Sequence, residues 1–326
     1  EAWTLAKGRP VMISGQPGYV DLTAPIFYIF KTGNFLARFW PALIGSMAAL
    51  LPFLFRERLG KTTALVLAVL LALDPFLISM ARSANGSMIA LVGLLAGIGF
   101  WYLRRPVWSG ISLGLSLLGG VDLWPGLIVF ALALFAAPKT LRFIWGAGEG
   151  NRKTDVKILA ISLAVTAGVI GTVFLTTPAG ISAVGSSLIE YFKSWGMPAQ
   201  TPYYSAAIIW LILEIPVLVF AVWGLILGIK EQNPLTSFCG IWGGLALLLS
   251  LVNHSRNLEE LFWASVPLLV LAATVISQLI PCIRVESKIV FYAEAAAVIA
   301  LCVFSFMNFT NLVNSNNMNP EDLRNR

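Results

Sequence analysis

Carboxylates are the residues in this sequence best suited to chemistry, and four of them lie in or near long apolar segments: Asp74, Asp122, Glu214 and Glu294. A charge in hydrocarbon costs roughly 3 kcal/mol or more, so such a group usually faces a bundle interior or a cavity. It then serves either as an acid–base group or as half of a pair that locks helices together. Asp74 and Glu214 fit both roles equally well, whereas Glu294, near a helix start, favours the locking role.

Three further carboxylates lie in segments that are too polar to be membrane helices. Glu1 and Asp21 belong to the first 35 residues, and Glu190 belongs to a long later segment. Each could accept a proton from a hydroxyl group that attacks an electrophile. The alternatives are a solvated terminal residue for Glu1 and a turn or helix-cap residue for Asp21, and the sequence leaves both alternatives open.

Two arginines stand at the ends of apolar runs, where a membrane protein meets the lipid headgroups. Arg82 ends one run in ISMARSANGS, and Arg256 precedes another in NHSRNLEELFW. The forked guanidinium donors suit a phosphate at this depth. Simple snorkelling of the side chain to the interface explains the same positions equally well.

Metal and nucleotide chemistry find little support in the sequence. His254 is the only histidine, which excludes a site with several histidines, and no Cys/His spacing matches a zinc site. Residues 146–150 read GAGEG but lack the strand, the Lys and the Ser/Thr of a phosphate-binding loop. The three cysteines lie in or beside apolar runs, and we expect free thiols at all of them: Cys239, Cys282 and Cys302.

Composition predicts an all-α polytopic membrane protein. Hydrophobic residues make up 58% of the 326 residues and charged residues only 12%, whereas a soluble domain carries roughly 25% charged residues. About 20 apolar residues span a bilayer as a helix, and the runs here do not alternate with period two. We expect about ten transmembrane helices, at 36–55, 62–80, 88–102, 107–121, 124–137, 157–176, 206–228, 235–252, 261–280 and 288–307.

The loops divide the chain into three parts and orient it. Residues 1–35 read as an outward loop with interfacial helices, 36–307 as the helix bundle and 308–326 as a polar outward tail. Lys and Arg gather in the short loops on one side, which predicts that this side is cytoplasmic. The opposite side then faces outward, with the segments 1–35, 81–87, 177–205, 253–260 and 308–326. The basic residues form no stripe, so nucleic acid is not an expected partner.

Several short motifs resemble those of the type C membrane glycosyltransferases. Glu1-Ala2-Trp3 is similar to the end of an outward Asp-Glu-Ala motif, and Asp21-Leu-Thr-Ala-Pro25 is similar to an Asp-x-Pro-Pro stretch. Further similar stretches follow in the same order: Ala37–Gly45, Arg56–Gly60, Ala72–Arg82, Gly119–Gly126 and Arg256–Leu269. Within that superfamily the chain resembles the protein O-mannosyltransferases, the aminoarabinose transferases and the archaeal-type flippase-associated relatives.

The resemblance implies an integral membrane enzyme that transfers a sugar at the outer membrane face. The donor would be a polyprenyl-phosphate-linked sugar and the acceptor a protein, a lipid or a glycan; a divalent metal is possible, and no other cofactor is expected. The family's base would be an Asp one position before Glu1, with Glu1 as its companion and Asp21 contacting the donor or supporting groups that do. Arg82, Arg256 and Asp122 would bind the lipid phosphate. A chain that starts at Glu1 is then expected to bind lipid but to transfer sugar poorly.

The rival hypothesis is a non-catalytic membrane subunit or lipid-binding scaffold derived from the same fold. Relatives often place an Asp a few residues after Ala-Arg, but residues 83–87 read Ser-Ala-Asn-Gly-Ser and contain no carboxylate. Transport ranks last, because Gly119-Gly120 and Pro125 provide a single helix break where two matched breaks are typical of transporters.

Overall fold

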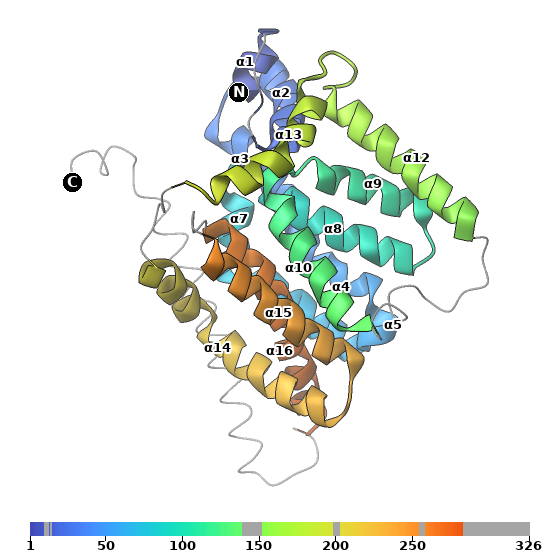
Figure 1. Ribbon diagram of the computed structural model, residues 1–326, viewed down its shortest axis with the longest axis vertical. Coiled ribbons are helices and arrows are strands. Elements are labelled where there is room, and N and C mark those ends of the chain that lie inside the picture. Colours follow the sequence, from blue (N-terminus) through green and yellow to red (C-terminus); the bar gives the residue numbers. More distant parts are fainter. Residues whose placement is uncertain (10–12, 14, 139–151, 198–202, 254–257, 283–326) are drawn as a thin grey trace.

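The computed structural model describes residues 1–9, 13, 15–138, 152–197, 203–253 and 258–282, and within these ranges every regular element is a helix (Figure 1). The all-α prediction is therefore confirmed. The elements are α1 (Ala2–Ala6), α2 (Pro17–Phe30), α3 (Asn34–Met47), η1 (Ala48–Leu50), α4 (Leu51–Leu54), α5 (Arg56–Leu59), α6 (Lys61–Leu73), α7 (Pro75–Arg82), α8 (Ser87–Tyr102), α9 (Pro106–Leu117), η2 (Gly120–Asp122), α10 (Leu123–Ala136), α12 (Arg152–Gly171), α13 (Ala179–Ser194), α14 (Tyr203–Lys230), α15 (Pro234–Val252), η3 (Leu258–Leu261) and α16 (Phe262–Cys282).

Membrane-crossing length is reached by four helical segments among the described residues: Asn34–Leu54, Arg152–Gly171, Pro234–Val252 and Phe262–Leu279. Two bent pairs raise the number to as many as six, Lys61–Leu73 with Pro75–Arg82 (54°) and Pro106–Leu117 with Gly120–Ala136 (113°). Nine of the ten predicted runs coincide with helices of the described chain. The tenth run, 288–307, lies outside the described residues.

The 54° bend was not predicted, because the run 62–80 reads as one apolar helix. Its cause is local. Asp74 adopts an extended conformation and its side chain accepts a hydrogen bond from the Leu77 N–H at 2.7 Å, which caps α7. Pro75 occupies the first position of α7, where its missing N–H does no harm. The Asp-Pro step therefore ends α6 and starts α7 in a new direction.

Helices α8, α9 and α12 pack through small residues. A β-carbon on Gly93 of α8 would lie 2.8 Å from the Ser112 carbonyl oxygen of α9, and one on Gly114 of α9 would lie 2.9 Å from the Leu163 carbonyl oxygen of α12. The Ser116 hydroxyl donates across the first of these contacts to the Ala90 carbonyl at 2.8 Å. Membrane helices commonly associate in this way, because lipid supplies no hydrophobic drive between them.

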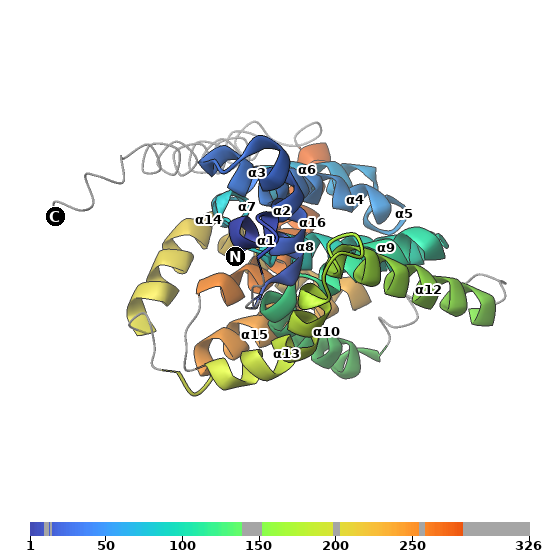
Figure 2. The ribbon, with the colours of Figure 1, turned by 90° about the horizontal axis from the view of Figure 1, so that it is seen from above.

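Helix α16 forms the centre of the bundle and packs against α6, α14 and α15. Its residues Ala264, Leu269 and Ala273 are fully buried. By contrast α12 buries only Gly171, and Figure 2 shows α12 and α14 on opposite sides of the molecule. The outer helices thus present apolar surface outward, as a bilayer requires.

The long segments predicted to face outward come together at one end of the bundle. Helix α13 packs against α2, η2 and α12, and α1, α2 and α13 lie side by side at the top of Figure 1. This end contains the groups described next.

Candidate functional site

A cavity of about 650 Å³ opens where α1, α2, η2 and α13 meet. Three carboxylates line it, Glu1, Asp122 and Glu190, together with the polar side chains of Gln16 and Tyr19. The remaining lining residues are small or apolar: Ala2, Trp3, Gly15, Val20, Phe27, Ala37, Ala84 and Val121. Of the candidates chosen from the sequence, the fold gathers Glu1, Asp122 and Glu190 here.

Asp122 is held rigidly at the end of η2. Its Oδ2 accepts hydrogen bonds from Gln16 Nε2 at 2.9 Å and from the Ser87 hydroxyl at 2.8 Å. Its backbone carbonyl accepts a third from the Trp263 indole at 3.1 Å. The three hydrogen bonds fix the position of Asp122 and its carboxylate at the cavity wall.

The turn before Asp122 depends on Gly120. Its φ of +68° lies in the left-handed region, and a β-carbon there would collide with the Gly15 carbonyl oxygen. The same carbonyl accepts the Val121 N–H at 2.8 Å. This contact binds the segment before α2 to η2 and closes the cavity on that side.

Gln16 is a site residue that sequence reasoning missed. While its amide nitrogen donates to Asp122, its Oε1 accepts the Gly86 N–H at 3.0 Å. One side chain therefore joins the segment before α2, the start of α8 and η2. Nothing in the sequence distinguishes Gln16 from other glutamines, because its partner Asp122 is 106 residues away.

Glu190 faces the cavity from α13. Its Oε1 accepts the Ser186 hydroxyl at 2.9 Å, one turn earlier on the same helix face. Its Oε2 is directed toward Gly15, where a β-carbon would lie 3.8 Å away. Glu1 is exposed at the start of α1. The two glutamates thus approach the cavity from different elements.

Asp21 does not line this cavity. Its side chain is 1% exposed and lies against Gly180 of α13, where any β-carbon would collide with Oδ2. Neither carboxyl oxygen has a hydrogen-bond partner within the described part of the chain. Burial raises the pKa of Asp21 to about 7. The role of Asp21 toward the donor stays a prediction.

The predicted phosphate-binding arginines are only partly described. Arg82 is the last residue of α7 and is half-buried, and Ala84, two residues further on, lines the cavity. Arg256 lies outside the described residues, as does His254. The approach of Arg82 to Arg256 stays a prediction.

Behind Glu190 lies a buried polar layer. Tyr191 is 1% exposed, and Asn253 donates from Nδ2 to Glu260 Oε1. Burial raises the pKa of Glu260 to about 7. Burial, and then the nearby Glu260 charge, raises the pKa of Tyr191 well above its ordinary value. The Asn253–Glu260 hydrogen bond joins the end of α15 to η3, and Tyr191 of α13 lies close enough to feel the charge of Glu260.

The carboxylates Asp74 and Glu214 lie elsewhere, inside the bundle. Glu214 is fully buried beside Asp74, and its Oε1 accepts the Ser265 hydroxyl at 3.2 Å. Neither lines the cavity of about 650 Å³. Their positions favour the helix-locking alternative, because the pair joins α7, α14 and α16. Glu294 is not among the described residues.

A second cavity of about 1230 Å³ lies on the other side of α1, between α1–α2 and the turn that joins α12 to α13. Trp3 lines both cavities. Val173, Phe174 and Leu175 follow α12 with φ of 49°, 56° and 68°, a left-handed run that costs roughly 1–2 kcal/mol per residue. Lys7 and Arg9 line this cavity too, with Lys7 Nζ 4.5 Å from the centre of the Trp3 ring.

Across the described ranges no three His, Cys, Asp or Glu side chains cluster as a metal site.

Comparisons with known proteins show the fold and the family of the chain. The overall fold is similar to ArnT from Cupriavidus metallidurans, solved bound to undecaprenyl phosphate and in the apo state, with a TM-score of 0.65 and 13% identity in both cases. The match covers 92% of this chain and 57% of the ArnT chain. No curated protein matches the sequence. The model of the dolichyl-phosphate-mannose-protein mannosyltransferase family matches residues 9–179, more than half of the chain. The chain belongs to this family and has a polytopic membrane fold of the glycosyltransferase C type.

Proposed function

We propose that this chain belongs to a membrane glycosyltransferase that uses a polyprenyl-phosphate-linked sugar, and that its site for sugar transfer faces outward. The observation that carries the proposal is the cavity of about 650 Å³ that Glu1, Asp122 and Glu190 line, close to the end of α7. Much of that cavity comes from the family-matched residues 9–179. The ArnT structure with bound undecaprenyl phosphate supports a lipid-phosphate donor.

The reaction needs a base and a site for a leaving phosphate. An acceptor hydroxyl attacks the sugar carbon, a carbon–oxygen bond forms, the bond from that carbon to the phosphate oxygen breaks, and polyprenyl phosphate leaves. The hydroxyl proton goes to a carboxylate within hydrogen-bond reach. Glu190 and Glu1 line the cavity and are the candidates, whereas the carboxylate of Asp122 is held by Gln16 and Ser87. In this proposal the base is one of these two glutamates, in place of the preceding Asp that the resemblance implied, with Glu1 as its companion.

Asp122 and Arg82 take different parts in this scheme. The carboxylate of Asp122 is held in place, which suits the orientation of sugar hydroxyls, so it orients the acceptor or the sugar and does not touch the phosphate. Arg82, at the end of α7, provides the forked donors for the phosphate. The role of Arg256 as its companion remains part of the proposal. Asp21 is buried away from the cavity, and we assign it to the packing of α2 on α13.

A transfer assay tests the proposal. The full chain is reconstituted in liposomes with a radiolabelled polyprenyl-phosphate sugar, beginning with mannose, and both glycosylated acceptor and released polyprenyl phosphate are measured. Glu190→Gln should abolish transfer while donor binding persists. The control is Glu231→Gln, which changes an exposed carboxylate in the loop between α14 and α15. Equal transfer by Glu190→Gln and Glu231→Gln would remove Glu190 from the mechanism.

Donor binding is measured separately. Arg82→Ala should weaken binding by about 1.5–3 kcal/mol, the value of a hydrogen bond to a charged group, and Arg82→Lys should restore only part of it. Arg105→Ala, at an exposed arginine before α9, is the control. Tight donor binding without transfer, in the wild type and with every acceptor tried, would favour the lipid-binding scaffold over the enzyme.

A further inference from the structure

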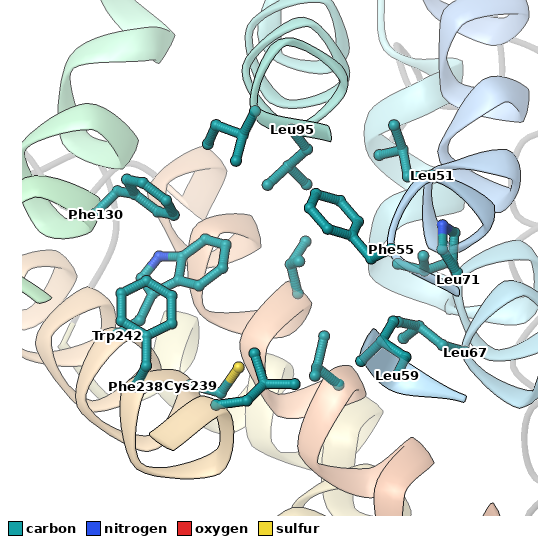
Figure 3. Close-up of a pocket in the computed structure, with 15 residues that line it drawn as sticks. Leu51, Phe55, Leu59, Leu67, Leu71, Leu95, Phe130, Phe238, Cys239 and Trp242 are labelled. Carbon is teal, nitrogen blue, oxygen red and sulfur yellow. The ribbon is translucent and has the colours of Figure 1, made fainter. Parts of the chain in front are cut away.

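A separate apolar cavity lies inside the bundle, at the end of the molecule away from α1 and α13 (Figure 3). Its volume is about 110 Å³. Its walls come from α4, α5, α6, α8, α10, α15 and α16, and the lining surface is entirely apolar. Figure 3 shows side chains such as Leu71, Leu95, Phe130 and Trp242 arranged around the common space. An apolar cavity of this kind stays dry and takes apolar guests.

Burial distinguishes the floor of this cavity from its mouth. Leu67, Leu71 and Trp242 are 4%, 6% and 4% exposed and form the floor. Phe55, Leu59 and Leu235 line the other end and are half-buried. They belong to the short turn around α5 and the start of α15, so this end of the cavity lies where helices begin and end.

The mouth is basic. Arg56 and Lys61 are exposed on the turn that carries Phe55 and Leu59, with Glu57 as the acidic residue among positions 55–61. Arg58 is anchored to the end of α8, since its Nε donates to the Tyr102 hydroxyl at 3.0 Å. Arg56 and Lys61 are therefore positioned at the level where an apolar chain entering the cavity would carry its headgroup.

We propose that this cavity binds the end of one chain of an anionic phospholipid, with the phosphate on Arg56 and Lys61. The apolar floor selects a hydrocarbon chain, and the basic turn selects a negative headgroup. A volume of about 110 Å³ takes the end of a chain, and Phe55, Leu59 and Leu235 would contact the part nearer the headgroup. This site is separate from the carboxylate cavity, the cavity of about 650 Å³ lined by Glu1, Asp122 and Glu190. The lipid proposal therefore does not depend on the proposed sugar transfer.

Native mass spectrometry of lipid retained after purification tests the proposal. The full chain is exchanged into nanodiscs of equal phosphatidylglycerol and phosphatidylcholine, released in mild detergent and weighed with its bound lipid. The wild type should retain one phosphatidylglycerol in clear excess over phosphatidylcholine. Leu71→Trp fills the floor and should lower retention at least tenfold. Leu65→Trp is the control, because Leu65 lies on the same helix and is 58% exposed, and it should retain lipid as the wild type does.

The headgroup is tested by the double variant Arg56→Gln/Lys61→Gln. Both side chains are exposed, so folding should persist, and the excess of phosphatidylglycerol should fall to near parity. This variant keeps the test decisive if Leu71→Trp lowers the yield of folded protein. An unchanged lipid preference in the double variant overturns the proposal. Retention by Leu71→Trp at the wild-type level, or retention of polyprenyl phosphate in place of phospholipid, also overturns it.

Discussion

Gln16 shows how a neutral side chain can set the position of a charged one. Its amide restrains Asp122 on one side and the Gly86 N–H on the other. Asp122 also accepts a bond from Ser87, so two separate segments hold the same carboxylate oxygen. The carboxylate is therefore oriented before any ligand arrives, which is the condition for an electrostatic contribution to catalysis.

Replacing Gln16 should impair the site without unfolding the protein. Gln16→Ala removes a hydrogen bond to a charged group, a loss of about 1.5–3 kcal/mol, and should lower sugar transfer roughly 10- to 100-fold. Transfer and thermal melting are measured on the same preparations. Gln278→Ala, an exposed glutamine on α16, is the control. If both variants transfer at the wild-type rate, Gln16 has no positioning role.

Asp21 should make stability depend on pH. Its pKa is about 7 in the folded chain against 3.8 ordinarily, so the folded state keeps a proton that the unfolded state releases. Stability should therefore be highest below pH 4 and fall by roughly 1.4 kcal/mol per pH unit up to about pH 7. Glu260 adds a slope of the same sign. Asp21→Asn should remove part of the slope and melt higher than the wild type at pH 8.

Melting temperatures from pH 4 to 8 check this prediction. Asp155→Asn is the matched control, because Asp155 forms a partly exposed ion pair with Arg104 at 3.8 Å, and it should leave the slope nearly unchanged. If the stability of Asp21→Asn changes with pH as steeply as that of the wild type, Asp21 is ionised in the folded state. If Asp21→Asn shows the predicted higher melting temperature at pH 8 but loses sugar transfer, Asp21 takes part in the transfer site.

Residue chemistry alone predicted part of the site. Carboxylates are scarce in an apolar chain and attract attention, so Glu1, Asp122 and Glu190 could be selected by type and segment. Asp21 was selected on the same grounds, but its side chain lies against Gly180. The sequence does not show which face of a short helix another helix covers. Gln16 and Ser87 could not be chosen, because amides and hydroxyls are common and only the fold brings them to Asp122.

At the level of elements, the small-residue contacts between α8, α9 and α12 decide how closely these helices approach. Adding a methyl group at Gly93 pushes against the Ser112 carbonyl and the Ser116 N–H, both 2.8 Å away and both backbone atoms that cannot rotate aside. The contact therefore has no soft side chain to absorb the strain.

Gly93→Ala should destabilise the bundle by about 1–3 kcal/mol, the usual range for overpacking. Gly168→Ala should raise stability by about 0.5–1 kcal/mol, because a β-carbon there meets no atom within 4 Å and alanine favours the helix. Thermal melting in one detergent compares the two. Equal shifts in the same direction would mean that the α8–α9 contact is looser than described.

Helix positions were well predicted, and helix directions were not. Lengths of apolar runs placed nine of the predicted segments on helices of the described chain, because a run near 20 residues has few alternatives in a bilayer. The bend at Asp74 could have been predicted, since an Asp followed by Pro is a known helix start. The 113° turn between α9 and α10 could not, because it depends on the contact between Gly120 and Gly15, far apart in the sequence.

For the whole molecule, the loop charges predicted which segments share an end, and segments 1–35 and 177–205 do meet there through α2 and α13. Orientation in the membrane is a separate matter. It stays a prediction, which rests on the concentration of Lys and Arg in the short loops on one side of the bundle.

Cysteine labelling in sealed vesicles tests the orientation. In a background without Cys239, Cys282 and Cys302, Ser182→Cys at the exposed start of α13 should react with an impermeant maleimide from outside. Lys153→Cys, at the exposed start of α12, should react only after the vesicles are opened. Reaction of both from the same side would overturn the orientation.

Helix α1 is only five residues long, yet its Trp3 is a wall of both the carboxylate cavity and the larger cavity beside the left-handed turn. The two compartments therefore share one partition. A molecule that enters either compartment and displaces Trp3 changes the shape of the other. Thermodynamic reciprocity then requires each occupant to alter the affinity of the other by the same factor. Cooperativity between two ligands thus needs no long-range rearrangement in this fold, because one indole ring can transmit it.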